Sequence, residues 1–354
     1  MSVRVEKLPH KCVNASPNAQ LLRVDNGKGT ICEIATYGAT LLSFKVDRDV
    51  ELIARFDQGE LPAMYGTYAG AAVGRVANRV GKAQFELDGK VYKVKANVPP
   101  NSLHGGAPGF HDVDWVVKSI FTTDKEVGVE LEYVSKDGEG GYPGTLTVCA
   151  RYSLSISDDP ELGLLYSAEL TNHHREHLST VVNICNHAYW NLNGKTDTIL
   201  DHYIQTYCPS WVSTDGECIP DGKLPTVTGT PLDFCGKPRK IGDRINDIGK
   251  EHGENFGYDY CVCALPPSEG TGHEMVAPKV TRKFGDITVD MKTIVVLSNP
   301  EGSGRKMTVS TNQPGCQIYT GNYLPGKLQH SCVALETQHL PDSPNQQGNP
   351  LFPS

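Results

Sequence analysis

The chain has 354 residues, of which 38% are hydrophobic and 21% are charged, an ordinary balance for a globular protein with enough apolar material for a core. Its formal net charge of -8 argues against a nucleic-acid backbone or an anionic membrane as the main partner, and a neutral small molecule fits better. The N-terminal residues lack the apolar stretch of a secretory signal, and no segment approaches the roughly 20 apolar residues of a membrane span, so a cytoplasmic protein is expected.

Alternation of apolar and polar residues with a period of two dominates the chain and predicts antiparallel strands. The Ala- and Gly-rich stretch 63–72 comes first, and its glycines lower helix propensity, so loop and strand are expected there. Alternating segments follow at 85–87, 91–94, 129–133 and 145–154. Asp88 and Gly89 separate the first two segments and predict a tight hairpin, because glycine tolerates a positive φ.

Glycine and proline punctuate the chain with 36 and 23 copies, so strands are short and helices have little room to extend. The segments 266–272 and 299–304 are the most loop-like, and composition does not change across either of them. They therefore indicate hairpin tips rather than domain linkers. We predict an all-β protein, a single antiparallel β-sandwich domain over residues 1–354, with two domains as the alternative.

Metal and cofactor motifs are missing from the sequence. The 11 cysteines lack paired CxxC spacing, which indicates reduced and mostly buried thiols. The histidine-rich run 172–177 has no HExxH spacing and is expected to be a polar turn. Without a P-loop or a GxGxxG fingerprint either, we expect no metal and no cofactor.

Six polar clusters lie in Gly-rich or aromatic surroundings, where loops and strand ends build binding sites. They read GRVANR (74–79), NSLHGG (101–106), NHAYWNL (186–192), GYDY (257–260), GCQIYTGN (315–322) and LETQ with PDSPN (335–345). Each also has an ordinary structural explanation. His104 could bond a loop carbonyl, His187 could belong to the core, Glu336 could be a solvated strand residue, and Asp259 and Arg79 could form a surface ion pair.

Taken together and in this order, the clusters resemble the galactose mutarotase family of aldose 1-epimerases over about residues 20–350. The resemblance implies a galactose mutarotase-like supersandwich. It also implies that Glu336 is the catalytic base, that His187 is the general acid and that His104 assists. The substrate-binding residues that it implies, including two beside the acid, are Asn78, Arg79, Tyr189, Trp190, Asp259 and Gln317.

Two features depart from the family pattern. Tyr260 stands where the family usually has a histidine after the aspartate, which bears on the orientation of Asp259. Family members also usually continue beyond residues 351–354 through a final strand pair, so an exposed strand edge is expected at this end of the fold.

The residue types suit ring opening of a sugar. A base takes the proton of the anomeric hydroxyl while an acid protonates the ring oxygen, and rotation about C1–C2 followed by reclosure gives the other anomer. Glu336 as a carboxylate and His187 as an imidazolium can do this by general acid/base catalysis, each worth about 10² to 10⁴ in rate. Nearby carboxylates such as Asp259 are expected to raise the pKa of His187.

Three other functions compete with an aldose 1-epimerase that acts on free galactose or glucose. A hexose-6-phosphate mutarotase would need additional Arg or Lys groups for the phosphate. A glycosidase would use Asp259 and Glu336 as its two carboxylates. A non-catalytic carbohydrate-binding protein would not need both a base and an acid. The epimerase accounts for the motifs best, and we expect a monomer that binds a monosaccharide and neither nucleic acid nor membrane.

Overall fold

The computed structural model describes residues 1–8, 17–54, 67–171, 179–194, 197–248, 257–265 and 276–352. In these residues every pairing between named strands is antiparallel, and the only helices are 3-10 turns of three residues. The all-β prediction is thereby confirmed. The chain divides into two compact units, Met1–Ala188 and Tyr189–Ser354, and the single-domain organisation stays a prediction.

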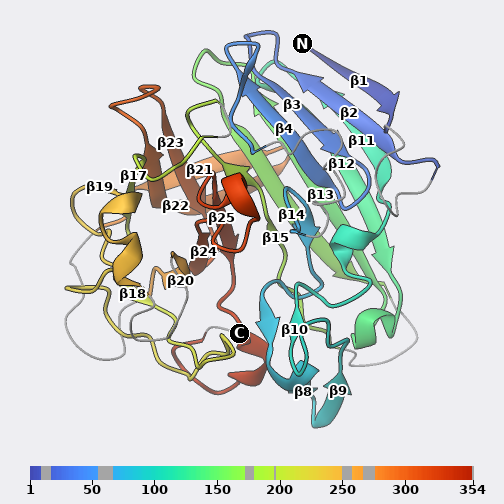
Figure 1. The fold of residues 1–354 in the computed structure, drawn as a ribbon. Helices are drawn as coiled ribbons and strands as arrows, with labels where there is room; N and C mark the ends of the chain where they lie inside the picture. The colour runs from blue at the N-terminus through green and yellow to red at the C-terminus, as the bar shows by residue number, and fades with distance from the viewer. Residues whose placement is uncertain are drawn as a thin grey trace. The chain divides into compact units, whose positions relative to one another are not determined.

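Two antiparallel sheets build most of the first unit (Figure 1). The first sheet contains, in order, β1 (Ser2–Lys7), β2 (Gln20–Asp25), β3 (Ile31–Ala35), β4 (Thr40–Val46) and β5 (Val50–Glu51). The second contains, in order, β11 (Val116–Thr122), β12 (Glu126–Ser135), β13 (Leu146–Ser155) and β14 (Leu162–Leu170). The alternating segments 129–133 and 145–154 lie almost entirely in β12 and β13, as predicted.

The two sheets pack face to face as a sandwich. β2 lies against β12, and in both strands apolar residues two positions apart are fully buried. Leu22 and Val24 of β2, and Val127 and Val129 of β12, have no exposed surface, so the apolar face of each sheet is buried against the other. Burial of each such side chain stabilises the fold by about 1.5–3 kcal/mol.

Three short ladders lie beside this sandwich in the same unit. They are β6 (Ala72–Val73) with β15 (Cys185–Asn186), β7 (Arg79–Val80) with β10 (Ser102–Leu103), and β8 (Gln84–Leu87) with β9 (Lys90–Lys93). The predicted hairpin is confirmed: Asp88 and Gly89 have φ of 52° and 74°, as a two-residue primed turn requires.

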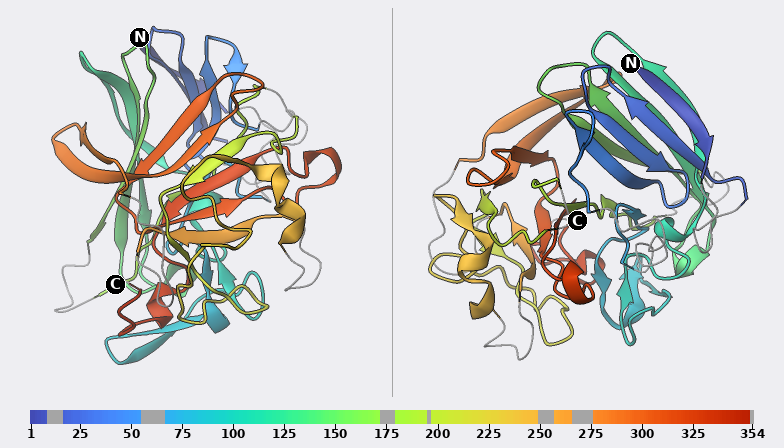
Figure 2. Two further views of the ribbon diagram at one scale, coloured as in Figure 1. Left: turned by 90° about the vertical axis from the view of Figure 1, so that its left-hand side faces the viewer. Right: turned by 45° about the horizontal axis from the view of Figure 1, so that its top comes forward.

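The second unit contains two further sheets. One has the order β16 (Tyr189–Trp190), β25 (Val333–Gln338), β24 (Gly315–Tyr319), β20 (Asp259–Cys263) and β18 (Ser210–Trp211). The other has the order β19 (Arg239–Lys240), β17 (Tyr203–Thr206), β22 (Ile287–Ser298) and β21 (Lys279–Phe284), and β23 (Lys306–Thr311) also pairs with β22. The strands of residues 279–311 are orange in Figure 2.

The remaining elements complete the description. The 3-10 turns are η1 (Gly81–Ala83), η2 (Phe110–Asp112), η3 (Glu139–Gly141), η4 (Ile241–Asp243), η5 (Ile245–Asp247), η6 (Gly326–Leu328) and η7 (Ser343–Asn345). The segment 299–304 connects β22 and β23 as a hairpin tip. Three segments discussed above lie outside the described residues, namely 63–66, 172–177 and 266–272. None of the ten cysteines of the described part is in a disulfide, and most are buried.

Candidate active site

His187 is held in place by its own backbone. Its N–H donates to the carbonyl of Ala71 at 3.0 Å, and its carbonyl accepts the N–H of Gly70 at 2.8 Å. Gly70 has φ +73°, and a Cβ there would lie 2.1 Å from the carbonyl oxygen of Leu41, so only glycine fits this turn. The Asn186 side chain also donates to the Gly70 carbonyl at 2.7 Å. These hydrogen bonds fix the position of the His187 backbone, and its imidazole is buried, with 5% of the residue exposed.

His104 and Asn78 form a reciprocal pair in which both residues adopt left-handed backbone angles, φ of 52° and 63°. The N–H of His104 donates to the Asn78 carbonyl at 3.0 Å, and the N–H of Asn78 donates to Nδ1 of His104 at 3.2 Å. Because Nδ1 accepts, the neutral ring carries its proton on Nε2. Gly105 permits the tight approach, since a Cβ there would lie 1.9 Å from the Gly74 oxygen.

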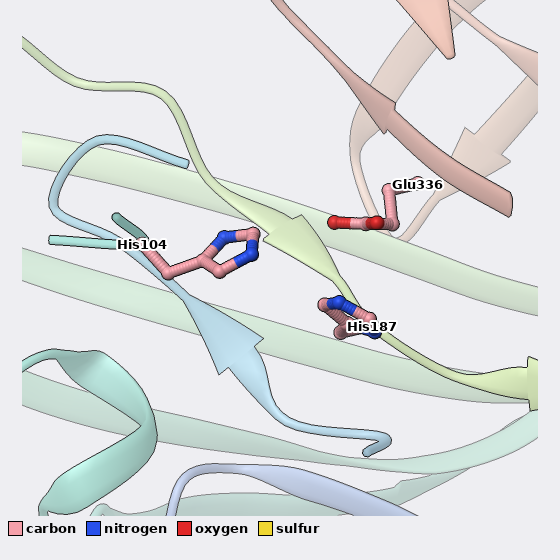
Figure 3. Close-up of side chains that lie close together, drawn as sticks. All are labelled: His104, His187 and Glu336. Atoms are coloured by element: carbon pink, nitrogen blue, oxygen red, sulfur yellow. The ribbon is translucent and has the colours of Figure 1, made fainter. Parts of the chain in front are cut away.

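The two imidazoles lie together. The His104 ring reaches toward His187 (Figure 3), and the ring centroids are 5.3 Å apart with planes at 72°. Burial lowers the pKa of His187 to about 4, with a further contribution from His111. Burial, with smaller electrostatic contributions from His187, His111 and Arg79, lowers the pKa of His104 well below its usual value. Both rings are therefore neutral at pH 7 in the free protein.

This result corrects the expectation that carboxylates such as Asp259 raise the pKa of His187. The imidazole is buried, and loss of hydration penalises its charged form. Desolvation is the largest cause of the shift, and it acts in the direction opposite to the one expected.

Arg79 brings a guanidinium close to the imidazoles. β7 pairs with β10 so that Arg79 lies opposite Leu103, the residue before His104. The buried Nη1 atom of Arg79 has no hydrogen-bond partner among the residues that the structure describes. A buried donor of this kind is costly unless a ligand satisfies it. The first unit thus places Asn78, Arg79, His104 and His187 in one neighbourhood, and their roles stay predictions.

Strand register collects the polar residues of the second unit. Gln317 lies directly opposite Glu336 on β25 and Cys261 on β20. Directly paired residues share one face of a sheet, and so do residues two positions apart. Asp259 is therefore on the face of Gln317 and Glu336, and the Gln317 amide donates to the Asp259 carboxylate at 2.7 Å. Glu336, drawn on its strand in Figure 3, is 2% exposed.

The same register separates two neighbours in the sequence. Tyr189 pairs with Ala334 and lies on the face of Glu336, whereas Trp190 pairs with Val333 and lies on the opposite face. The role of Trp190 in sugar binding therefore stays a prediction without support from the register.

Tyr260, in place of the family's usual histidine, lies on the face of β20 opposite Asp259 and packs on Tyr258 at 5.8 Å between ring centroids. It is 7% exposed. It thus belongs to the packed interior of the second unit.

Two further residues near the imidazoles, Tyr68 and His111, lie outside the six motifs. The Tyr68 ring lies 4.6 Å from that of His104 between centroids, and His111 packs on the Tyr68 ring at 4.7 Å. Tyr68 lies within the Ala- and Gly-rich stretch 63–72, whose composition predicted only loop and strand. The GFHD segment before Trp115 has no recognisable catalytic spacing. Neither residue carried a signal that sequence reasoning alone would find.

Comparison with known proteins identifies the family. The family model for aldose 1-epimerase matches residues 20–353. The chain belongs to the aldose 1-epimerase family. Galactose mutarotase of Bos taurus is 35% identical over 335 residues, covering 91% of this chain and 85% of that protein. Galactose mutarotase of Homo sapiens is 33% identical over 349 residues, covering 95% and 86%. The resemblance inferred from the motifs is thereby confirmed.

Solved structures share the fold. A galactose 1-epimerase from Lactobacillus acidophilus matches with a TM-score of 0.76 and 23% identity, over 99% of this chain and 92% of that one. An aldose epimerase homologue from C. elegans matches with a TM-score of 0.74 and 22% identity, over 95% and 93%. The predicted galactose mutarotase-like fold is confirmed. Among the described residues, no helix has the length and apolar character needed to span a membrane.

Proposed function

We propose that this protein is a mutarotase that interconverts the α and β anomers of a free hexose, galactose or glucose. The observation that carries the proposal is the family match over residues 20–353. The positions that the resemblance assigns to base and acid hold a buried carboxylate and a buried imidazole, Glu336 and His187, which are the groups that the chemistry needs.

In the proposed reaction Glu336 accepts the proton of the anomeric hydroxyl, and His187 donates a proton to the ring oxygen. The C1–O5 bond breaks, and the open-chain aldehyde rotates about C1–C2. On reclosure the roles reverse, because Glu336 now holds a proton and His187 can accept one. The pair takes up one proton from solvent when the sugar binds and shares it throughout the cycle, so the complex with the sugar ends in its starting state.

The low pKa of His187 adds a requirement to this mechanism. An imidazolium in a buried site needs a negative charge to stabilise it. We propose that His187 carries the proton only while the Glu336 carboxylate and the sugar are in place. A proton held this weakly passes readily to the ring oxygen, which favours the ring-opening step.

The other groups are proposed to bind the sugar. Nε2–H of His104 and the buried Nη1 of Arg79 are donors for hydroxyl oxygens. The Asp259 carboxylate, held by Gln317, is an acceptor for hydroxyl hydrogens. A cytoplasmic monomer that needs no cofactor remains our expectation for the active protein.

Polarimetry on freshly dissolved α-galactose and α-glucose tests the proposal. We expect the protein to speed the approach to the equilibrium rotation of both sugars, and to act more slowly on their 6-phosphates. Nitrophenyl galactosides and glucosides should give no nitrophenol above background. Binding of galactose without any acceleration would support a carbohydrate-binding protein instead, faster action on the 6-phosphates would favour a phosphosugar mutarotase, and steady release of nitrophenol would favour a glycosidase.

A further inference from the structure

Tyr68 lies among three imidazoles of the first unit. Its ring centroid is 4.6 Å from that of His104, 4.7 Å from that of His111 and 6.0 Å from that of His187. The ring is tilted by 58° to His104, meets His111 edge to face at 77°, and is nearly parallel to His187 at 27°. Aromatic pairs at these separations have preferred relative orientations. The ring of Tyr68 therefore constrains the planes of both histidines of the proposed site.

The backbone of Tyr68 is tied to the segment that holds His187. The Tyr68 carbonyl accepts the N–H of Ala71 at 3.0 Å, and Gly70 and Ala71 make the two backbone bonds to His187. Tyr68 itself has φ +60°, a left-handed angle that is unfavourable for a bulky residue and persists only where the surroundings determine it. The same turn thus places the ring of Tyr68 and holds the backbone of His187.

The hydroxyl of Tyr68 is linked to the segment that holds His104. The Asn97 amide donates to this hydroxyl at 3.3 Å and to the carbonyl of Leu103 at 2.9 Å. The N–H of Leu103 in turn donates to Asn97 Oδ1 at 2.8 Å. Asn97 therefore connects Tyr68 to the residue immediately before His104.

We propose that Tyr68 is a positioning residue that holds His104 and His187 in their working orientation and shields both rings from water. The inference deepens the proposed function and rests on it. Tyr68 transfers no proton in this scheme. Burial and the charge of Asp112 raise the pKa of its hydroxyl, so the phenol stays protonated.

The pKa values of His104 and His187 also depend on the charged and titratable groups around them in the first unit. Arg79 acts on His104, and His111 acts on both rings. His111 in turn contacts the Asp112 carboxylate at 3.3 Å. A substitution at Tyr68 removes none of these groups. Because the Tyr68 ring also packs on His111, its replacement uncovers both imidazoles, and a change in the titration of His187 reports the loss of the covering ring.

The test compares Tyr68→Leu, which removes the ring, with Tyr68→Phe, which removes only the hydroxyl. Tyr92→Leu is the matched control, because Tyr92 is also partly buried but packs on Phe85. The kcat and KM are measured by polarimetry, and the C2–H resonance of His187 is followed against pH by NMR. His187→Gln identifies that resonance.

We expect Tyr68→Leu to lower kcat by about 10- to 100-fold, as misplaced catalytic groups do, with KM changed much less. The titration midpoint of His187 should rise from about 4 toward the ordinary value of about 6.5. Tyr68→Phe should keep both the midpoint and most of kcat, and Tyr92→Leu should change neither. If Tyr68→Leu does not fold, Tyr68→Met serves as the second ring-free variant.

An unchanged midpoint or an unchanged kcat in the folded ring-free variant would overturn the proposal. The two readouts also separate this proposal from the proposed function. A wild-type protein without mutarotase activity would refute the proposed function, whereas the NMR midpoint would still show whether Tyr68 shields His187.

Discussion

The buried, neutral His187 predicts a specific acid sensitivity of the fold. Burial lowers the pKa of His187 in the folded protein to about 4, whereas an unfolded chain has the ordinary value of about 6.5. As the pH falls below about 6.5, the unfolded state takes up the proton first, so the free energy of unfolding decreases. The loss from this one group is about 2 kcal/mol at pH 5 and about 3 kcal/mol at pH 4.

Replacement of His187 by Gln removes this proton-binding site. Urea unfolding of the wild-type protein and of His187→Gln at pH 7 and pH 5 measures the difference. We expect the wild-type protein to lose about 2 kcal/mol more than the variant between these pH values. His202→Gln is a second case, because burial also lowers the pKa of His202 to about 4, and its effect should have the same sign. An equal pH dependence in wild type and His187→Gln would refute the neutral, buried imidazole.

Three further predictions concern the binding face, the metal requirement and the core. Gln317→Met removes the amide that holds Asp259 and should raise KM by roughly fivefold, the effect of losing about 1 kcal/mol of hydrogen bonding; an unchanged KM would separate Gln317 from sugar binding. Activity should survive EDTA and dialysis, and loss that one divalent metal restores would contradict the proposed chemistry. Phe85→Ala should lower the free energy of unfolding by about 3–5 kcal/mol in urea, since Phe85 is 1% exposed and packs between Tyr92 and Tyr142; a loss below about 1 kcal/mol would show that this cluster adds little.

Local patterns predicted the strands well because the information lies within a few residues. The alternation along β12 and β13 is a property of neighbouring side chains, and the Asp88-Gly89 turn needs only two residues that tolerate a positive φ. The split of Tyr189 and Trp190 to opposite faces follows from the same period of two, although their adjacency in the sequence suggested a shared role.

The assembled geometry depends on contacts between distant residues. The register that places Asp259 opposite Tyr319 joins strands far apart in the sequence, and the register that places Gln317 opposite Glu336 spans the loop between β24 and β25. No local pattern determines either. The low pKa of His187 and the place of Tyr68 among the imidazoles depend on burial, which a single sequence does not specify.

The central claim is that Glu336 and His187 act as one acid/base pair on a single sugar. The direct test is kcat of wild type, Glu336→Gln, His187→Gln and the double variant, measured by polarimetry on fresh α-galactose. Each single substitution should lower kcat by about 10² or more. The double variant should lose little beyond the more damaging single change, because groups that act as a unit are not additive. Losses that multiply to about 10⁴, or near wild-type turnover by folded Glu336→Gln, would contradict the claim.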